Sequence, residues 1–313
     1  MADDLQLAMR VATVALNLAA AIAVGATTAS LPLSGSASPW AARQCGRARL
    51  ASMAGLTTAM LASAWLLLFE AASMAEVPVA QAGEALWTML TATHLGAAWM
   101  IGLSALAASL AAAAAVRGGG RRKWLVPLAL LGLAVFLYTR SMVSHASSDG
   151  DFSPAMLADW FHLAMISLWV GEVFVAGALI LANPVGARAD DGNAAARYVE
   201  SLSATATVAL AGIVASGVFS AWHNLGSINE LTGNPYANTL FIKVSLAGVA
   251  VLMGGYNRFF VMPSLLDGLR RNDPAGASDV RRFMLILRLE TTVLMGVLIM
   301  AAVLSSTPPP SAA

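Results

Sequence analysis

Hydrophobic residues in this chain gather into long segments that short polar loops separate. Eight such segments cover roughly residues 5–30, 50–75, 84–116, 124–145, 155–182, 200–224, 239–262 and 283–306. A helix that crosses the ~30 Å hydrocarbon core of a bilayer needs ~20 apolar residues, so each segment is long enough to span a membrane. The segments lack the alternation of membrane barrel strands, which predicts helices. We therefore expect an all-α polytopic membrane protein with eight transmembrane helices.

The composition is that of a chain lying almost wholly within a bilayer. Hydrophobic residues make up 58% of the 313 positions and charged residues 11%, whereas about a quarter of a soluble domain is charged. The longest loops, about 31–49 and 263–282, are too short for a soluble domain, so residues 1–313 are predicted to form a single transmembrane domain. The basic clusters suit membrane lipids, and nucleic acid is not expected as a partner.

Basic residues occur only in every second loop. The loops after the first, third, fifth and seventh segments carry Arg43, Arg47, Arg49, Arg117, Arg121, Arg122, Lys123, Arg188, Arg197, Arg270, Arg271, Arg281 and Arg282. The other loops carry acidic residues and no Lys or Arg. Because cytoplasmic loops are enriched in Lys and Arg, the basic loops are predicted to be cytoplasmic and both termini to face outward.

All four histidines lie toward the outward ends of the segments. His145 and His223 are expected at the ends of segments four and six, although His223 is alternatively an interfacial residue. At 1.5 Å per residue, His162 is expected roughly 10 Å inside segment five and His94 roughly 15 Å inside segment three. Ionisable groups at such depth are costly and usually functional. We therefore expect the imidazoles to line a funnel that opens outward.

Methionines accompany two of these histidines. Met142 precedes His145 by three residues, and Met165 follows His162 by three, so each pair is expected to share a helix face. Thioether and neutral imidazole form a soft, uncharged ligand set that suits Cu(I), and imidazole also accepts Cu(II). The residues therefore predict a copper site at the outward end. The alternative for any single Met, among 15 in the chain, is to fill the core.

Asp159 lies three residues before His162, and two roles are open for it. Its carboxylate could accept a hydrogen bond from one ring nitrogen of His162, so that the other nitrogen binds the metal. Alternatively, Asp159 pairs with Lys243, which enters segment seven at a similar depth. The two roles are compatible.

A second set of charged residues lies deeper in the segments. Glu172, Arg258, Arg288 and Glu290 fall in the cytoplasmic half, and Arg140 lies well inside segment four. Unpaired charges are costly in hydrocarbon, so these side chains are expected to face the bundle interior. They either form structural ion pairs, or Glu172 or Glu290 relays protons or receives a cation from the outer site.

Several motifs resemble the copper resistance protein D (CopD) family, and the resemblance is strongest over 138–306. The motifs are Ser144-His145-Ala146, Ala158-Asp159-Trp160-Phe161-His162-Leu163, Trp169-Val170-Gly171, Ser216-Gly217-Val218, Pro235-Tyr236, Lys243, Tyr256-Asn257-Arg258-Phe259, Glu290 and Ser306-Thr307-Pro308. The first half of the chain is similar mainly through its hydropathy and the region around His94.

The resemblance implies an eight-helix, multi-pass inner-membrane protein that handles copper, so the outward side on which the basic loops place both termini is the periplasm. It also implies a periplasmic partner of the CopC type and movement of copper inward. His145, His162 and Trp169 carry over by motif, although Ser144 replaces a glycine that the family often has. The chain has no segment that resembles the phosphorylation or nucleotide domain of a P-type ATPase, and no enzymatic activity is expected.

Three functions follow from these features. The leading hypothesis is copper transport through the outer His/Met site. A membrane haem b electron carrier is the alternative from another class, because His94 and His162 could ligate a single haem. A copper-sensing or docking scaffold without flux would use the same residue types.

Overall fold

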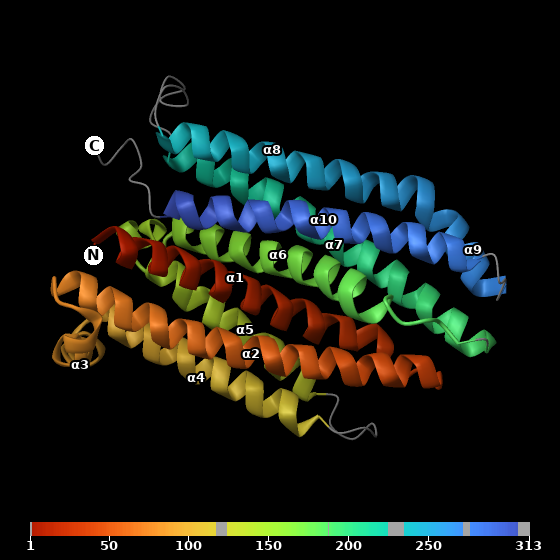
Figure 1. The fold of residues 1–313 in the computed structure, drawn as a ribbon, viewed down its shortest axis with the longest axis horizontal. Helices are drawn as coiled ribbons and strands as arrows, with labels where there is room; N and C mark the ends of the chain where they lie inside the picture. The colour runs from red at the N-terminus through yellow and green to blue at the C-terminus, as the bar shows by residue number, and fades with distance from the viewer. Residues whose placement is uncertain (1, 117–123, 187, 225–234, 272–275, 306–313) are drawn as a thin grey trace.

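The structure, a computed structural model, describes residues 2–116, 124–186, 188–224, 235–271 and 276–305 as a bundle of long helices (Figure 1). The elements are α1 (Ala2–Leu33), α2 (Pro39–Met74), η1 (Val79–Gln81), α3 (Gly83–Ala92), α4 (His94–Ala115), α5 (Leu125–Met142), η2 (His145–Asp149), α6 (Pro154–Val175), η3 (Ala176–Ile180), α7 (Ala189–Asn224), α8 (Pro235–Tyr256), η5 (Asn257–Val261), α9 (Met262–Arg271) and α10 (Gly276–Ser305). Within these ranges there is no strand. Eight helices of the described part are long and apolar enough to cross a membrane, which confirms the predicted all-α fold.

The two ends of the bundle differ in charge. α1 begins and α10 ends at the same end, on the left in Figure 1. The loop that carries Asp151 lies there, and we name it the acidic end. Arg43, Arg270 and Arg271 lie at the opposite end, which we name the basic end.

Two spans begin with the same local sequence, a serine followed by proline. The Ser38 side chain accepts a hydrogen bond from the backbone N–H of Ala41 at 3.0 Å, and Ser153 accepts one from Met156 at 3.2 Å. The following prolines have no N–H group, so they suit the first turn, where backbone N–H groups lack helical partners. These caps set the starts of α2 and α6.

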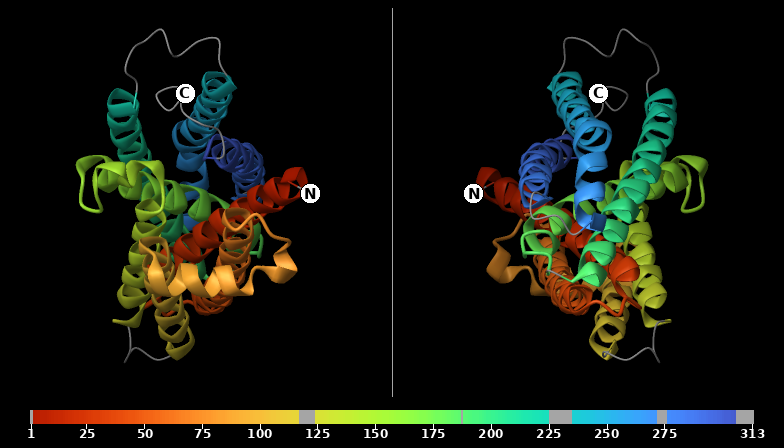
Figure 2. Two further views of the ribbon diagram at one scale, coloured as in Figure 1. Left: turned by 90° about the vertical axis from the view of Figure 1, so that its left-hand side faces the viewer. Right: turned by 90° about the vertical axis from the view of Figure 1, so that its right-hand side faces the viewer.

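The predicted segment 84–116 is two helices rather than one. The backbone is extended at Thr93, and its side chain accepts a hydrogen bond from Gly96 N at 3.0 Å, which starts α4. A Cβ atom at Gly96 would lie 2.1 Å from the carbonyl oxygen of Met89, so α4 can begin this close to α3 only because residue 96 is glycine. As a result, α3 lies across the acidic end of the bundle (Figure 2).

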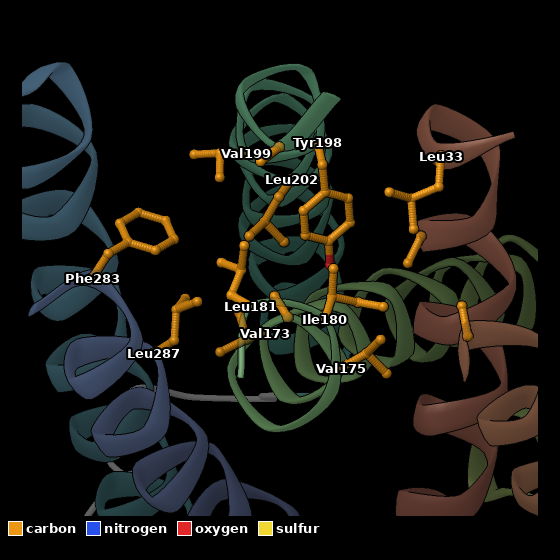
Figure 3. Packing of buried hydrophobic residues seen from close by; sticks show 14 of the residues in the cluster. Leu33, Val173, Val175, Ile180, Leu181, Tyr198, Val199, Leu202, Phe283 and Leu287 are labelled. Atoms are coloured by element: carbon orange, nitrogen blue, oxygen red, sulfur yellow. The ribbon is translucent and has the colours of Figure 1, made fainter. Parts of the chain in front are cut away.

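α1 lies between the two halves of the bundle and contributes to two hydrophobic cores. One core joins α1 to α6, α7 and α10 and includes Val173, Tyr198 and Leu287 (Figure 3). The other joins α1 to α2, α4 and α5 and includes Leu56 and Leu106.

The crossing of α1 and α6 depends on two glycines. A Cβ atom at Gly25 would lie 2.0 Å from the carbonyl carbon of Gly171, and one at Gly171 would lie 1.8 Å from the carbonyl oxygen of Ala21. No larger residue fits at either position without moving the helices apart. This close crossing positions the next residue of α6, Glu172, inside the bundle.

Candidate functional site

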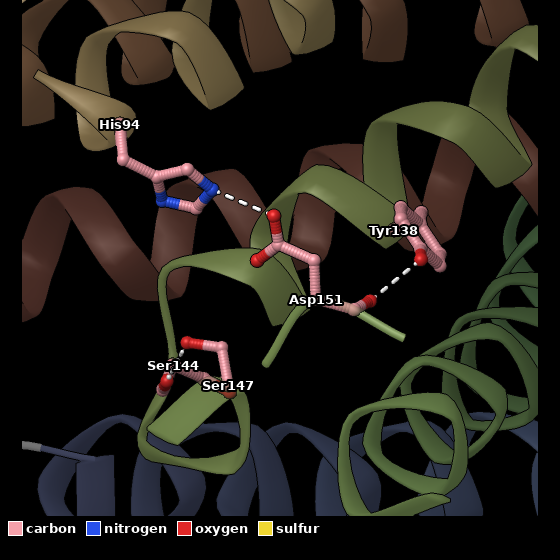
Figure 4. A network of polar contacts seen from close by, with 5 residues as sticks. All are labelled: His94, Tyr138, Ser144, Ser147 and Asp151. Atoms are coloured by element: carbon pink, nitrogen blue, oxygen red, sulfur yellow. Dashed lines mark hydrogen bonds and ion pairs between the residues drawn. The ribbon is translucent and has the colours of Figure 1, made fainter. Parts of the chain in front are cut away.

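His94 lies at the acidic end as the first residue of α4, and 58% of its side chain is exposed. Its Nε2 atom lies 2.8 Å from Asp151 Oδ2 (Figure 4). Tyr138 donates a hydrogen bond to the backbone carbonyl of Asp151 at 2.7 Å, which holds this loop against α5. The predicted depth of roughly 15 Å for His94 is wrong, because α4 begins anew at that position.

His145 follows the end of α5 and does not share a helix with Met142. α5 ends at Met142, and the short helix η2 begins at His145. The Ser144 side chain caps η2 by accepting a hydrogen bond from Ala146 N at 3.2 Å, while Ser147 donates to the carbonyl of Ser144 at 2.8 Å (Figure 4). The expectation that His145 and Met142 share a helix face is therefore wrong. The side chains of His145 and His223 lie outside the described part of the chain.

His162 lies on α6 and contacts α7 inside the bundle. Its Nδ1 atom lies 2.9 Å from the hydroxyl oxygen of Ser216. That hydroxyl group donates its single hydrogen to the carbonyl of Gly212 at 2.6 Å. Nδ1 therefore carries the ring hydrogen and donates it to Ser216, which leaves Nε2 with a free lone pair. Neutral imidazole in this tautomer is suited to bind a metal through Nε2.

Met165, like His162, contacts helix α7. A Cβ atom at Gly212 of α7 would lie 2.6 Å from Met165 Cγ and 3.1 Å from its sulfur atom. One at Gly217 would lie 3.6 Å from His162 Cε1. The two glycines of α7 therefore make room for the thioether and the imidazole, so both side chains of α6 face α7.

Asp159 has a partner other than His162. Its Oδ2 atom accepts a hydrogen bond from the Ser144 hydroxyl group at 3.2 Å. Arg140 and Lys243 are both close enough to interact electrostatically with the carboxylate. Nδ1 of His162 is occupied by Ser216, so the charge-neutralising role of Asp159 fits the geometry better than the role of orienting that ring.

Arg140 lies in a polar cluster of the same half of the bundle. Its guanidinium carbon lies 5.2 Å from the centre of the Trp99 ring, within the range of a cation–π contact. Glu70 of α2 also interacts with it electrostatically. Glu70 was not predicted as a site residue, although a lone carboxylate in an apolar run was the signal that could have found it.

The two deep carboxylates each have a neutral partner. Glu172 is 4% exposed and accepts a hydrogen bond from the Thr205 hydroxyl group of α7. Glu290 is 2% exposed and accepts one from Trp169 Nε1 at 3.1 Å. The motif residue Trp169 thus connects α6 to α10.

The deep arginines also bind neutral groups, contrary to the expected ion pairs. Arg258 donates to the carbonyl and hydroxyl oxygens of Ser203 at 2.8 and 2.9 Å and to the Thr207 hydroxyl group. Arg288 Nε donates to the carbonyl of Gly177 at 3.2 Å. Gly177 lies in the π-helix η3, where the widened turn changes the backbone hydrogen bonding. Among the described side chains, neither arginine forms an ion pair with Glu172 or Glu290.

A cavity of about 380 Å³ lies between α6, α7, α8, η5, α9 and α10. Its walls are mostly apolar, and Trp169, Asn257, Arg258 and Glu290 also line it. Asn257 begins the π-helix η5 and was not predicted as a site residue, because nothing in the sequence marks a π-turn there.

No three His, Cys, Asp or Glu side chains of the described residues lie close enough together to hold a metal ion. Methionine sulfur atoms are not counted among these groups, and the side chains of His145 and His223 lie outside the described residues. Of the predicted ligands, His162 and Met165 both face α7, and His94 lies at the mouth of the bundle.

Two family models match the chain. The model described as "Copper resistance protein D-like, N-terminal domain" matches residues 1–154, and the model "Copper resistance protein D" matches residues 196–304. His94, His145, Lys243 and Glu290 lie within the matches, whereas His162 lies between them.

Known proteins similar to the chain include two from bacteria. Copper resistance protein D of Pseudomonas syringae pv. tomato is 29% identical over 216 residues, which cover 66% of this chain and 67% of that protein. Copper transport protein CutJ of Bacillus subtilis (strain 168) is 26% identical over 188 residues, or 60% of this chain. The match spans only 31% of the length of CutJ. No solved structure matches the chain.

Proposed function

Because this chain belongs to the copper resistance protein D family, we propose that it transports copper ions across the inner membrane, inward from the periplasm. Family membership and eight apolar helices make it a copper-related, multi-pass membrane protein. In the proposal, the acidic end faces the periplasm and the basic end the cytoplasm, in keeping with the enrichment of Lys and Arg in cytoplasmic loops.

The observation that carries the proposal is the hydrogen bond between His162 and Ser216. Ser216 accepts the Nδ1 hydrogen, so Nε2 is free to bind copper inside the bundle. A metal-binding tautomer held by a neighbouring side chain is the usual arrangement for histidine ligands. A neutral site of this kind suits a soft, weakly charged ion such as Cu(I).

Other ligands complete the proposed site from the acidic end. Met165 supplies a thioether on the same helix as His162. In the proposal, Met142 at the end of α5 and His145 in η2 are further ligands. His94, exposed at the mouth, is the first described ligand that an entering ion would meet, and His223 near the end of α7 is a further proposed ligand. Imidazoles alone would also hold Cu(II), so the proposal covers both oxidation states.

Beyond His162, the proposed path follows the polar groups of α6. Asp159 and Lys243 set the charge near the site, and Trp169 links the path to Glu290. Glu172 lies one turn further along α6, bound to Thr205. These two carboxylates form the inner part of the path, as relays or handoff points for the cation.

The acidic end is the proposed docking face for a periplasmic copper carrier of the CopC type. The loop that carries Asp151 and helix α3 lie there, and His94 is accessible to a carrier. The chain has a relative named as a copper transport protein, which supports transport as the outcome of that encounter.

Copper uptake into proteoliposomes tests this function. Full-length protein should carry copper into the lumen, and His162→Ala should reduce uptake to the level of empty liposomes. Met165→Leu should slow uptake, whereas Met100→Leu, a matched control on the exposed face of α4, should not. Equal uptake by the wild type and His162→Ala would refute the proposed site.

The alternative functions give different results in the same preparations. A membrane haem carrier would show a Soret band in its visible absorption spectrum, whereas a copper transporter should not. A scaffold would bind copper without uptake. Nε2 of His94 bonds to Asp151, so a haem ligated through that atom would have to replace this contact, whereas the bond of His162 Nδ1 to Ser216 could stay.

A further inference from the structure

The cavity between α6, α7, α8, η5, α9 and α10 contains a buried carboxylate without a cationic partner among the described residues. Glu290 is 2% exposed, and its described hydrogen bond comes from the neutral Trp169 indole. Gly254 of α8 faces it, and a Cβ atom there would lie 3.2 Å from Glu290 Oε1. An ionised carboxylate in such surroundings loses its hydration and gains no opposite charge in return.

The charged groups around Glu290 do not neutralise it. Arg258 lines the same cavity, but its guanidinium group is bound to Ser203 and Thr207 of α7. On α10 itself, Arg288 donates to Gly177. α6 presents a second acid, Glu172, one turn beyond Trp169. α1, which also packs on α10, has no titratable residue from position 11 to its end.

The same cavity contains an acceptor without a donor. Asn257 is 3% exposed, and no described group donates a hydrogen bond to its Oδ1 atom. Buried acceptors of native proteins nearly always have a donor. Asn257 opens the π-helix η5, and such turns are frequent at functional sites.

A single proton on Glu290 would remove its uncompensated charge and supply the donor that Asn257 Oδ1 lacks. A protonated carboxyl group carries no charge, and its O–H group is a hydrogen-bond donor. We propose that Glu290 is a proton-binding site in this cavity, with Asn257 Oδ1 as the acceptor of its O–H group, directly or through one water molecule.

This site supplies a coupling ion, an inference that rests on the proposed copper transport. When a cuprous ion reaches the inner path, the O–H bond of Glu290 breaks, the proton leaves to water, and the positive charge of the ion compensates the carboxylate. When copper leaves, Glu290 binds a proton again. One proton therefore exchanges for one cuprous ion, with no net change in the charge of the site.

Infrared spectroscopy of the full-length protein in lipid tests the proton site without copper. The wild type should show the C=O band of a protonated carboxyl group at neutral pH, and Glu290→Gln should lose one such band. Asp267→Asn removes a carboxylate that is 69% exposed and should change nothing in this region. An identical band in the wild type and Glu290→Gln would overturn the proposal.

A second variant keeps the test informative if Glu290→Gln does not fold. Asn257→Leu leaves Glu290 in place and removes its acceptor, so the band should persist and shift to the position of a more weakly bonded carboxyl group. A band that does not shift would overturn the role of Asn257.

Copper-driven proton release, followed with a pH-sensitive dye, then tests the coupling. One proton per copper ion is expected for the wild type and none for Glu290→Gln. The infrared band without any copper uptake would defeat the proposed function alone, whereas uptake without the band would defeat the proton site alone.

Discussion

The orientation of His162 depends on one hydroxyl group. Ser216→Ala removes the acceptor of the Nδ1 hydrogen, so the ring loses its fixed tautomer while the helix contact with α7 stays. We expect copper affinity to fall about 10–100-fold with little change in folding. Titration against a copper chelator measures this. The control is Ser201→Ala, which lies earlier on the same helix. Equal copper affinities for the two variants would contradict the role of Ser216 in orienting His162.

The charge of Asp159 is expected to matter more for stability than for copper affinity. Asp159→Asn leaves Lys243 and Arg140 with less compensating charge, at a cost of about 1–3 kcal/mol. Melting in detergent should fall for the single variant and recover in the double variant with Lys243→Met. A large loss of copper affinity in Asp159→Asn with unchanged melting would instead show that the carboxylate acts on the copper site.

At the residue scale, the sequence was a good guide to which side chains enter the bundle and a poor guide to their partners. Glu172 and Glu290 were correctly expected to be interior, because apolar segments flank them, and His162 is half-buried. Their neutral partners Ser216, Thr205 and Trp169 were not predicted, since serine and threonine are ordinary residues in such helices.

The helices themselves follow hydropathy, but their breaks do not. The eight spans agree with the apolar segments. The break at Thr93 comes from one capping hydroxyl group and one glycine, and hydropathy averaged over a window does not detect either. That break moves His94 from the expected interior to the mouth. The π-helices η3 and η5 likewise have no hydropathy signal.

The crossing of α1 and α6 is the element contact most sensitive to size. Gly171→Ala places a methyl group 1.8 Å from the carbonyl oxygen of Ala21, which forces the helices apart. We expect a loss of about 1–3 kcal/mol or more, seen as a lower melting temperature in detergent. Gly248→Ala, where no atom lies within 4 Å of the added carbon, is the control and should be neutral or stabilising. Equal melting of the two variants would contradict the crossing.

At the scale of the whole molecule, the orientation in the membrane stays a prediction from the basic loops. Single cysteines in a Cys45→Ser background test it. Ser148→Cys, at the acidic end, should react with a membrane-impermeant thiol reagent in intact spheroplasts. Asp267→Cys, at the basic end, should react only after lysis. Reaction of Asp267→Cys in intact spheroplasts would show that the protein has the opposite orientation in the membrane.

Copper transport by the proposed path requires that His162 holds the ion inside the bundle. X-ray absorption spectroscopy of protein loaded with Cu(I) measures the ligands directly. We predict imidazole nitrogen and thioether sulfur around the copper, with loss of a nitrogen in His162→Ala and loss of a sulfur in Met165→Leu. A shell of oxygen ligands, or spectra that do not differ between the wild type and these variants, would contradict copper binding by His162 and Met165.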